Sequence, residues 1–159
     1  DRYKIFRQLD IFNTLSDGEI DKLNSISSDV KFKAEERVIN EGDSHDYFYV
    51  VKKGGLRVTR NHILLAVLTA GSIVGELSLL DGGPASATVI AVEDTDLIRI
   101  GFSDLQGLME KEKDMALKVY KSFSRTLSMR LRDANEWLSM CHRDWLSELS
   151  RSLKNYPHM

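Results

Sequence analysis

The sequence has one cysteine, two prolines and no long apolar run among its 159 residues. A lone Cys141 cannot form an intramolecular disulfide, so a reducing compartment, and hence a cytoplasmic location, is the simpler expectation. No stretch approaches the roughly 18–20 apolar residues of a membrane-spanning helix, and no signal peptide opens the chain. The first residue is Asp1, which is compatible with a natural start further upstream. These absences predict a soluble single domain, or one domain with a long appended element.

Neither sign of charge dominates, because 22 Lys and Arg residues stand against 24 Asp and Glu residues. A net charge of −2 argues against binding of nucleic acid by the protein surface as a whole. The distribution is uneven: residues 1–107 carry 12 basic and 17 acidic side chains, whereas residues 108–159 carry 10 and 7. Within residues 115–132 there is no acid, and the cations are Lys118, Lys121, Arg125, Arg130 and Arg132. The basic excess is therefore confined to the C-terminal part.

Groupings typical of catalysis or metal binding are also missing. Of the four histidines, His45, His62 and His142 show no metal-ligand spacing with Cys141. Cys141 and His142 are adjacent on a predicted helix, so they point about 100° apart and cannot form a nucleophile–base pair. No Gly-x-x-x-x-Gly-Lys-[Ser/Thr] loop for a nucleoside triphosphate occurs. We therefore expect a protein that is not an enzyme, with no catalytic residue, no metal site and no required cofactor.

Glycine divides the chain into two parts. All ten glycines lie between Gly18 and Gly107, and residues 108–156 contain neither glycine nor proline. This distribution predicts a turn-rich β segment followed by a long helical segment. Ser16 and Glu19 form a predicted capping box of an N-terminal helix. The short apolar or alternating runs lie at 30–33, 37–40, 47–51, 56–60, 63–68, 87–92 and 97–100. Seven or eight strands at this spacing indicate a barrel or jelly roll.

From Asp114 to about residue 149, apolar residues recur at three- and four-residue spacing. They include Ala116, Tyr120, Phe123, Leu127, Ala134, Trp137, Leu138, Cys141 and Trp145. A helix of ~35–40 residues is about 50–60 Å long, which exceeds what a small barrel covers. We therefore predict a parallel homodimer through residues 116–145, with domains at 1–113 and 114–155. A helical hairpin, broken near Asn135 or near 141–144, is the alternative.

Residues 71–92 carry the clearest ligand-binding pattern. Gly75 allows a close approach of the backbone to a ligand, and Glu76 begins a short helical turn whose free N–H groups can face an anion. The hydroxyl of Ser86 and the N–H of Ala87 are placed to close such a cradle from the other side. Glu76 stands in an apolar run, so a buried carboxylate here needs a donor such as a sugar hydroxyl. A capped turn between two strands is the alternative interpretation.

These motifs, in their order, resemble those of the cyclic-nucleotide-binding domain, the superfamily of catabolite activators, protein kinase A regulatory subunits and cyclic-nucleotide-gated channels. The resemblance extends from about residue 5 to at least residue 135. It implies a mainly β fold, a β-roll or jelly roll with an N-terminal helix and a long C-terminal helix. It also implies a phosphate-binding cassette at residues 75–87 that binds a cyclic mononucleotide such as cAMP or cGMP. The motifs are Glu41-Gly42-Asp43, Phe48–Gly54, Ala70–Leu77 and Pro84–Val89.

By this resemblance, Glu76 corresponds to the glutamate that binds the ribose 2′-hydroxyl, and Ser86 and Ala87 correspond to the phosphate-contacting pair. The remaining positions implied to line the same site are Gly75, Leu77, Ser78, Val58, Leu65, Ala66 and Leu68. Arg130 falls at a position that covers the base. An arginine whose stem packs while its guanidinium reaches solvent is the alternative for Arg130.

One position departs from the pattern, because Ala85 stands where the family has its phosphate-binding arginine. Removing one partner of a buried charge pair costs on the order of 2–5 kcal/mol. Two functions therefore remain open: a nucleotide-sensing regulatory module, or a degenerate, ligand-independent dimerisation or interaction domain. Only 14 residues follow Trp145, so we expect no DNA-binding domain in this chain.

Overall fold

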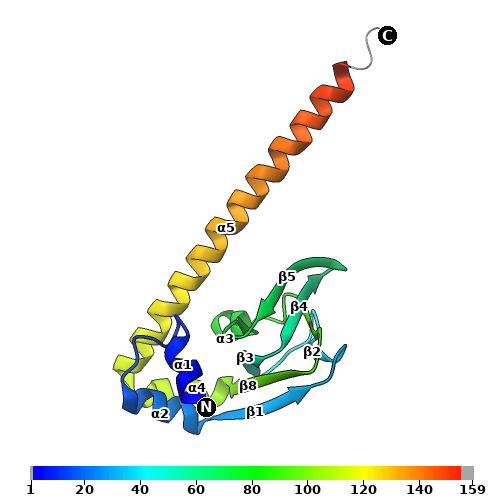
Figure 1. Cartoon of the computed structure of the whole chain (residues 1–159). Helices are drawn as coiled ribbons and strands as arrows, with labels where there is room; N and C mark the ends of the chain where they lie inside the picture. Colours follow the sequence, from blue (N-terminus) through cyan, green and yellow to red (C-terminus); the bar gives the residue numbers. More distant parts are fainter. Residues whose placement is uncertain (1, 155–159) are drawn as a thin grey trace. The chain divides into compact units, whose positions relative to one another are not determined.

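The computed structural model describes residues 2–154, with all their side chains except those of residues 149, 150 and 152–154. Eight antiparallel strands form two four-stranded sheets, in the orders β1-β8-β3-β6 and β2-β7-β4-β5 (Figure 1). The strands are β1 (Ser27–Phe32), β2 (Arg37–Ile39), β3 (Tyr47–Lys53), β4 (Gly55–Arg60), β5 (Ile63–Thr69), β6 (Ile73–Val74), β7 (Thr88–Ala91) and β8 (Thr95–Gly101). The helices are α1 (Arg2–Gln8), α2 (Asp17–Ser25), α3 (Glu76–Asp81), α4 (Phe102–Lys111) and α5 (Lys113–Lys154). The predicted jelly roll with an N-terminal helix and a long C-terminal helix is confirmed.

The two sheets face each other across an apolar cluster. Four consecutive residues of β3, from Phe48 to Val51, and five of the seven residues of β8 are buried, so both faces of the sheet that holds these strands are covered. One of these faces contributes to the cluster, together with residues of β4 and β7. The buried members are Ile39, Tyr49, Val51, Leu56, Val74, Ala85, Val89, Ala91 and Leu97. Ala85, which precedes β7, is therefore part of the core between the sheets.

Two elements were not predicted from the sequence. The strand β6 has only two residues, and it is defined by its pairing with Tyr49 and Val50 of β3. The helix α4 contains Gly107, which lowers the intrinsic helix propensity of the segment. Burial of Leu105 and Met109 on one face of α4 supplies the stabilisation that propensity lacks.

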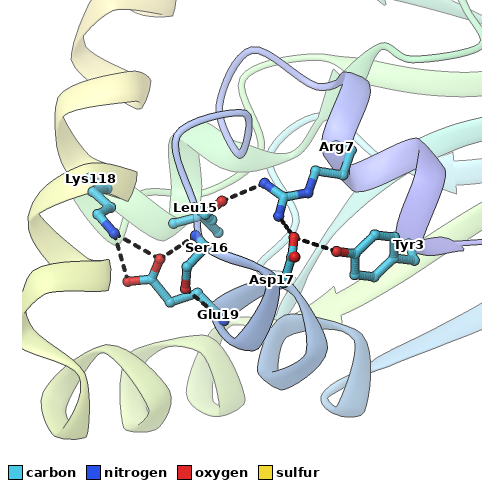
Figure 2. A network of polar contacts seen from close by, with 7 residues as sticks. All are labelled: Tyr3, Arg7, Leu15, Ser16, Asp17, Glu19 and Lys118. Carbon is cyan, nitrogen blue, oxygen red and sulfur yellow. Dashed lines mark hydrogen bonds and ion pairs between the residues drawn. The ribbon is translucent and has the colours of Figure 1, made fainter.

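The predicted capping box at the start of α2 is confirmed. The Ser16 hydroxyl accepts a hydrogen bond from the Glu19 N–H at 3.3 Å, and the Ser16 N–H donates to Glu19 Oε2 at 2.6 Å. Glu19 also accepts two hydrogen bonds from Lys118 Nζ, at 2.8 and 3.0 Å (Figure 2). The same carboxylate therefore caps α2 and binds the second turn of α5.

A second group of contacts fixes α1 to the start of α2. The Arg7 guanidinium donates to the Leu15 carbonyl at 2.5 Å and pairs with the Asp17 carboxylate. Tyr3 donates its hydroxyl to the same Asp17 oxygen at 2.6 Å (Figure 2). These bonds hold the two N-terminal helices together, so Glu19 has a fixed frame from which to reach Lys118.

We expect the Glu19 contact to make stability depend on pH. Burial raises the pKa of Glu19, but hydrogen bonds from Lys118 and Ser16 outweigh it, so the pKa lies below its ordinary value. A lowered folded-state pKa gives stability that is present above the unfolded-state pKa and is lost as pH falls through the folded-state value. Glu19→Gln should therefore lower the free energy of unfolding by about 1 kcal/mol at pH 7. Urea unfolding should show this loss shrinking towards zero near pH 3.

The exposed Glu110 offers a matched control for this experiment. Glu110→Gln should change the free energy of unfolding by less than about 0.5 kcal/mol at either pH. An equal loss from Glu19→Gln at pH 7 and pH 3 would contradict an ionic role and leave only the neutral capping contact.

The helix α5 is continuous over its 42 residues, so the hairpin alternative, with a break near Asn135 or 141–144, is wrong. The chain divides into two compact units, residues 1–119 and 120–159. Within the part of the chain that the structure describes, no helix is long and apolar enough to cross a membrane.

Candidate functional site

The first half of the predicted cassette is a tight turn into α3. Gly75 precedes α3 and has a φ of 86°, a left-handed backbone conformation that residues other than glycine rarely adopt. A Cβ atom at Gly75 would lie 3.1 Å from His45 Cε1, from Ile39 Cδ1 and from the Tyr47 carbonyl oxygen. Glycine is therefore required here both by the backbone conformation and by the close packing of its neighbours.

The side chains of α3 divide between interior and solvent. Glu76 is 4% exposed and Ser78 is 8% exposed, whereas Leu77 is 39% exposed. Burial of the Glu76 carboxylate at the first position of α3 agrees with the apolar run in which it stands. A carboxylate beside the N–H groups of a helix start is electrostatically favoured. Its proposed role towards a ribose hydroxyl stays a prediction.

The second half of the cassette is held by a loop that is distant in the sequence. The Gly42 N–H donates to the Ala85 carbonyl at 2.8 Å, and the Ala85 N–H donates to the Asp43 carbonyl at 2.9 Å. The Glu41 N–H donates to Thr88 Oγ1 at 3.0 Å. Residues 41–43 therefore bind the Ala85 backbone before Ser86 and the Thr88 side chain after it. The sequence marked these residues as a turn and a family motif, but their bonding to Ala85 is visible only in the structure.

At residues 85–87, which lie next to the loop of residues 41–43, the side chains alternate between interior and solvent. Ala85 and Ala87 are 5% and 9% exposed, and Ser86 between them is exposed. Val58 and Leu68, two of the positions implied to face a ligand, pack against the same interior cluster as Ala85. The structure thus gathers Val58, Leu68 and Ala85 on the interior.

Leu65 is placed differently from these residues. Val58 pairs with Ala66 and Thr59 pairs with Leu64, so Leu65 is the residue left over at a β-bulge in β5. Its side chain is 57% exposed. A bulge breaks the two-residue alternation, which is why alternation alone does not place Leu65.

His45 is a site neighbour that sequence reasoning did not assign. Its Nε2 atom lies 3.0 Å from Ser78 Oγ, and its Nδ1 atom lies 2.8 Å from the Tyr47 carbonyl oxygen. Its ring lies 5.4 Å from the Phe102 ring. The only sequence signal for this role is proximity to the Glu41-Gly42-Asp43 motif, because the contacts come from elements far apart in the chain.

The segment of the sequence that contains the cassette has acids but no cations. Residues 61–98 contain no lysine or arginine but five acids: Glu76, Asp81, Glu93, Asp94 and Asp96. Burial raises the pKa of the Tyr49 phenol above its ordinary value, so this interior hydroxyl stays neutral at pH 7. A cation for a bound phosphate must therefore come from outside residues 61–98.

Arg130, the predicted substitute cation, is an exposed residue of the unit formed by residues 120–159. Its contact with a ligand stays a prediction. Arg57, on β4, binds the Glu35 carboxylate through two hydrogen bonds of 2.8 and 2.5 Å and is already engaged. Among the described residues, no group of three or more His, Cys, Asp or Glu side chains could hold a metal ion.

The fold is thus a β-roll whose inter-sheet core borders a glycine-started helical turn and which is followed by a long helix. The chain belongs to the cyclic nucleotide-binding domain family, whose pattern matches residues 29–112.

Two curated relatives illustrate this membership. The Cyclic AMP receptor protein of Thermus thermophilus is 31% identical over 130 residues, which are 79% of this chain and 58% of the relative. The cAMP-dependent protein kinase regulatory subunit of Debaryomyces hansenii is 34% identical over 91 residues, 57% of this chain and 19% of the relative. The chain thus spans less than two thirds of the length of these relatives.

A solved structure covers the fold more fully. The N-terminal domain of a transcriptional regulator from Streptomyces coelicolor superposes with a TM-score of 0.71 at 29% identity. The superposition covers 84% of this chain and 94% of that domain. The β-roll and its flanking helices therefore recur in a regulatory protein.

Proposed function

We propose that this chain is a ligand-sensing regulatory module, not an enzyme, which binds a cyclic nucleotide or a related nucleotide in the cassette of residues 75–87. The observation that carries the proposal is the geometry of the cassette. Gly75 starts α3, the buried Glu76 carboxylate follows, and Gly42 and Asp43 fix the backbone of Ala85. The chain belongs to the cyclic nucleotide-binding domain family. The names of two of its relatives, a cyclic AMP receptor protein and a cAMP-dependent protein kinase regulatory subunit, refer to cAMP.

Titration calorimetry of the purified protein against cAMP, cGMP and cyclic dinucleotides tests the proposal. Trp137 and Trp145 are the only tryptophans of the chain, and both are exposed on α5. Tryptophan emission therefore reports on α5 alone. A ligand that binds in the cassette and also shifts this emission supports sensing, whereas binding without a shift supports binding only.

We expect Glu76→Gln to weaken the binding of any ribose-containing ligand. The neutral amide keeps the shape of the side chain but loses the charged acceptor, and hydrogen bonds to charged groups contribute about 1.5–3 kcal/mol. Affinity should therefore fall about 10- to 150-fold in calorimetry. Glu93→Gln, at an exposed position, should leave affinity unchanged. Unchanged binding by Glu76→Gln, with an unchanged circular dichroism spectrum, would remove the ribose role.

A second candidate function is a degenerate module that dimerises or docks without ligand. Ala85 in place of an arginine, and the absence of lysine and arginine from residues 61–98, specifically favour it. No binding of any tested nucleotide by a folded protein would select this second function. The location in the cytoplasm stays a prediction.

The proposed output element is α5, paired in parallel with a second copy. Exposed or half-exposed residues follow each other at alternating intervals of three and four: Leu117, Tyr120, Ser124, Leu127, Leu131, Ala134, Leu138, Cys141 and Trp145. This spacing is the heptad repeat of a left-handed coiled coil. Phe123 does not belong to it, since its side chain is 2% exposed. The predicted stripe thus combined a buried and an exposed face of α5.

A further inference from the structure

His45 contacts three elements that meet beside the cassette. Its ring nitrogens lie 3.0 Å from Ser78 Oγ on α3 and 2.8 Å from the Tyr47 carbonyl oxygen at the start of β3. The ring lies 5.4 Å from that of Phe102, the first residue of α4, at an interplanar angle of 58°. One side chain therefore contacts α3 and α4, which are separated by β7 and β8 in the sequence.

The hydrogen bonds indicate which tautomer a neutral imidazole adopts here. A carbonyl oxygen only accepts, so the Nδ1 atom must carry a proton and donate it to the Tyr47 carbonyl. In the neutral ring Nε2 is then an acceptor, and the Ser78 hydroxyl donates to it. Ser78 is 8% exposed and His45 is half-exposed, so the bond between them is partly buried.

The backbone next to His45 reinforces the connection to α4. The Phe102 N–H donates to the Asp46 carbonyl at 2.8 Å, which fixes the first turn of α4 to the residue after His45. Only Glu112 separates α4 from α5. If α3 is displaced and moves the His45 ring, the contact of that ring with Phe102 changes. Phe102 is the first residue of α4, the helix that leads to α5.

We propose that His45 is the positioning residue that couples α3 to α4, so that a change in the cassette shifts the start of α4 through the Ser78–His45–Phe102 contacts. This relay rests on the proposed function for its trigger, because a ligand in the cassette is what would displace α3. Close packing supports the transfer, since a Cβ atom at position 75 would lie 3.1 Å from His45 Cε1, which is tighter than an ordinary contact. A movement of the ring changes its contacts with Ser78 and Phe102.

A double-mutant cycle tests the relay in the ligand-free protein. His45→Asn keeps a donor for the Tyr47 carbonyl but is too short to contact Ser78 and Phe102, and Ser78→Ala removes only the hydroxyl. Each change should raise the hydrogen-exchange rate of the Phe102 amide about 3- to 10-fold, which corresponds to the loss of one hydrogen bond. The double variant should exchange no faster than His45→Asn alone. His62→Asn, at an exposed turn with φ 66° that asparagine tolerates, should have no effect.

Two outcomes would overturn the relay. One is an unchanged Phe102 amide in Ser78→Ala, because a merely structural His45 would confine that change to α3. The other is additive rates in the double variant, which would mean that the two residues act separately. His45→Gln, which restores a polar group at the Nε2 position, should recover part of the native rate and guards against a simple folding defect.

A second experiment measures the response to cAMP. It uses the native chain, or the Ala85→Arg variant if the native chain binds cAMP too weakly. At a concentration that calorimetry shows to be saturating, cAMP should change amide exchange across α4, and His45→Asn should lose most of this change while still binding. A full α4 response in His45→Asn contradicts the relay. Absence of binding in both backgrounds counts against the proposed function, and the ligand-free cycle then decides the relay by itself.

Discussion

Ala85→Arg should tighten the binding of cAMP or cGMP by about 2 kcal/mol or more, which is about 30-fold in dissociation constant. The native chain should bind both nucleotides only weakly. A cyclic phosphate carries one negative charge, and the segment of residues 61–98 offers it five acids and no lysine or arginine. An arginine at position 85 would supply a bidentate counter-ion.

The structure adds a cost to this gain. Ala85 is 5% exposed and belongs to the apolar cluster between the sheets, and its backbone is fixed by bonds to Gly42 and Asp43. Without ligand, the guanidinium would be partly desolvated. We therefore expect Ala85→Arg to lower the Tm of the free protein by roughly 2–4 °C for each 1 kcal/mol lost. A saturating cyclic nucleotide should raise the Tm of this variant by more than it raises the Tm of the native chain.

Two controls separate charge at the site from charge in general. Ala85→Met adds volume without charge and should not improve binding. Ala34→Arg adds the same charge at an exposed turn and should leave affinity within about twofold. Tight native binding that Arg130→Ala abolishes would contradict the prediction and assign the phosphate charge to Arg130. Tight native binding that survives Arg130→Ala would exclude both explanations.

The second large effect concerns assembly. Light scattering at micromolar concentration should give a mass of about twice 18.1 kDa. Glu in place of Leu131 or Leu138 should return the protein to a monomer, because a charge in a coiled-coil seam is buried without a partner. Both leucines are exposed in the single chain, at 63% and 69%, so neither change should unfold it. Ser139→Glu, exposed and next to the seam on α5, should remain dimeric.

Cys141 reports the direction of pairing. In a parallel, in-register coiled coil, identical seam residues of the two copies face each other. Mild oxidation with diamide should therefore join two chains through Cys141, and a band of doubled mass should appear on a non-reducing gel. A dimer that does not crosslink would indicate antiparallel pairing, and a monomer over the whole concentration range would contradict the coiled coil.

Much of the fold could be predicted because local signals agree with the final structure. Turn residues bound seven of the eight strands, Ser16 and Glu19 mark the start of α2, and the absence of glycine and proline from residues 108–156 marks α5. The remaining elements depend on partners. The strand β6 is defined by its hydrogen bonds to β3, and α4 forms around Gly107 because Leu105 and Met109 are buried.

For the candidate site, the family resemblance supplied the cassette and the expectation of an arginine at position 85, which stay predictions, while the residues themselves predicted the burial of Glu76 and the need for glycine at position 75. Local chemistry determines these features: a left-handed turn needs glycine, and a carboxylate in an apolar run becomes buried. Only the tertiary structure decided that Gly42 and Asp43 clamp Ala85, that a bulge exposes Leu65, and that His45 contacts α3 and α4. Those features depend on hydrogen bonds and packing between segments distant in the chain, which periodicity and spacing along one segment do not encode.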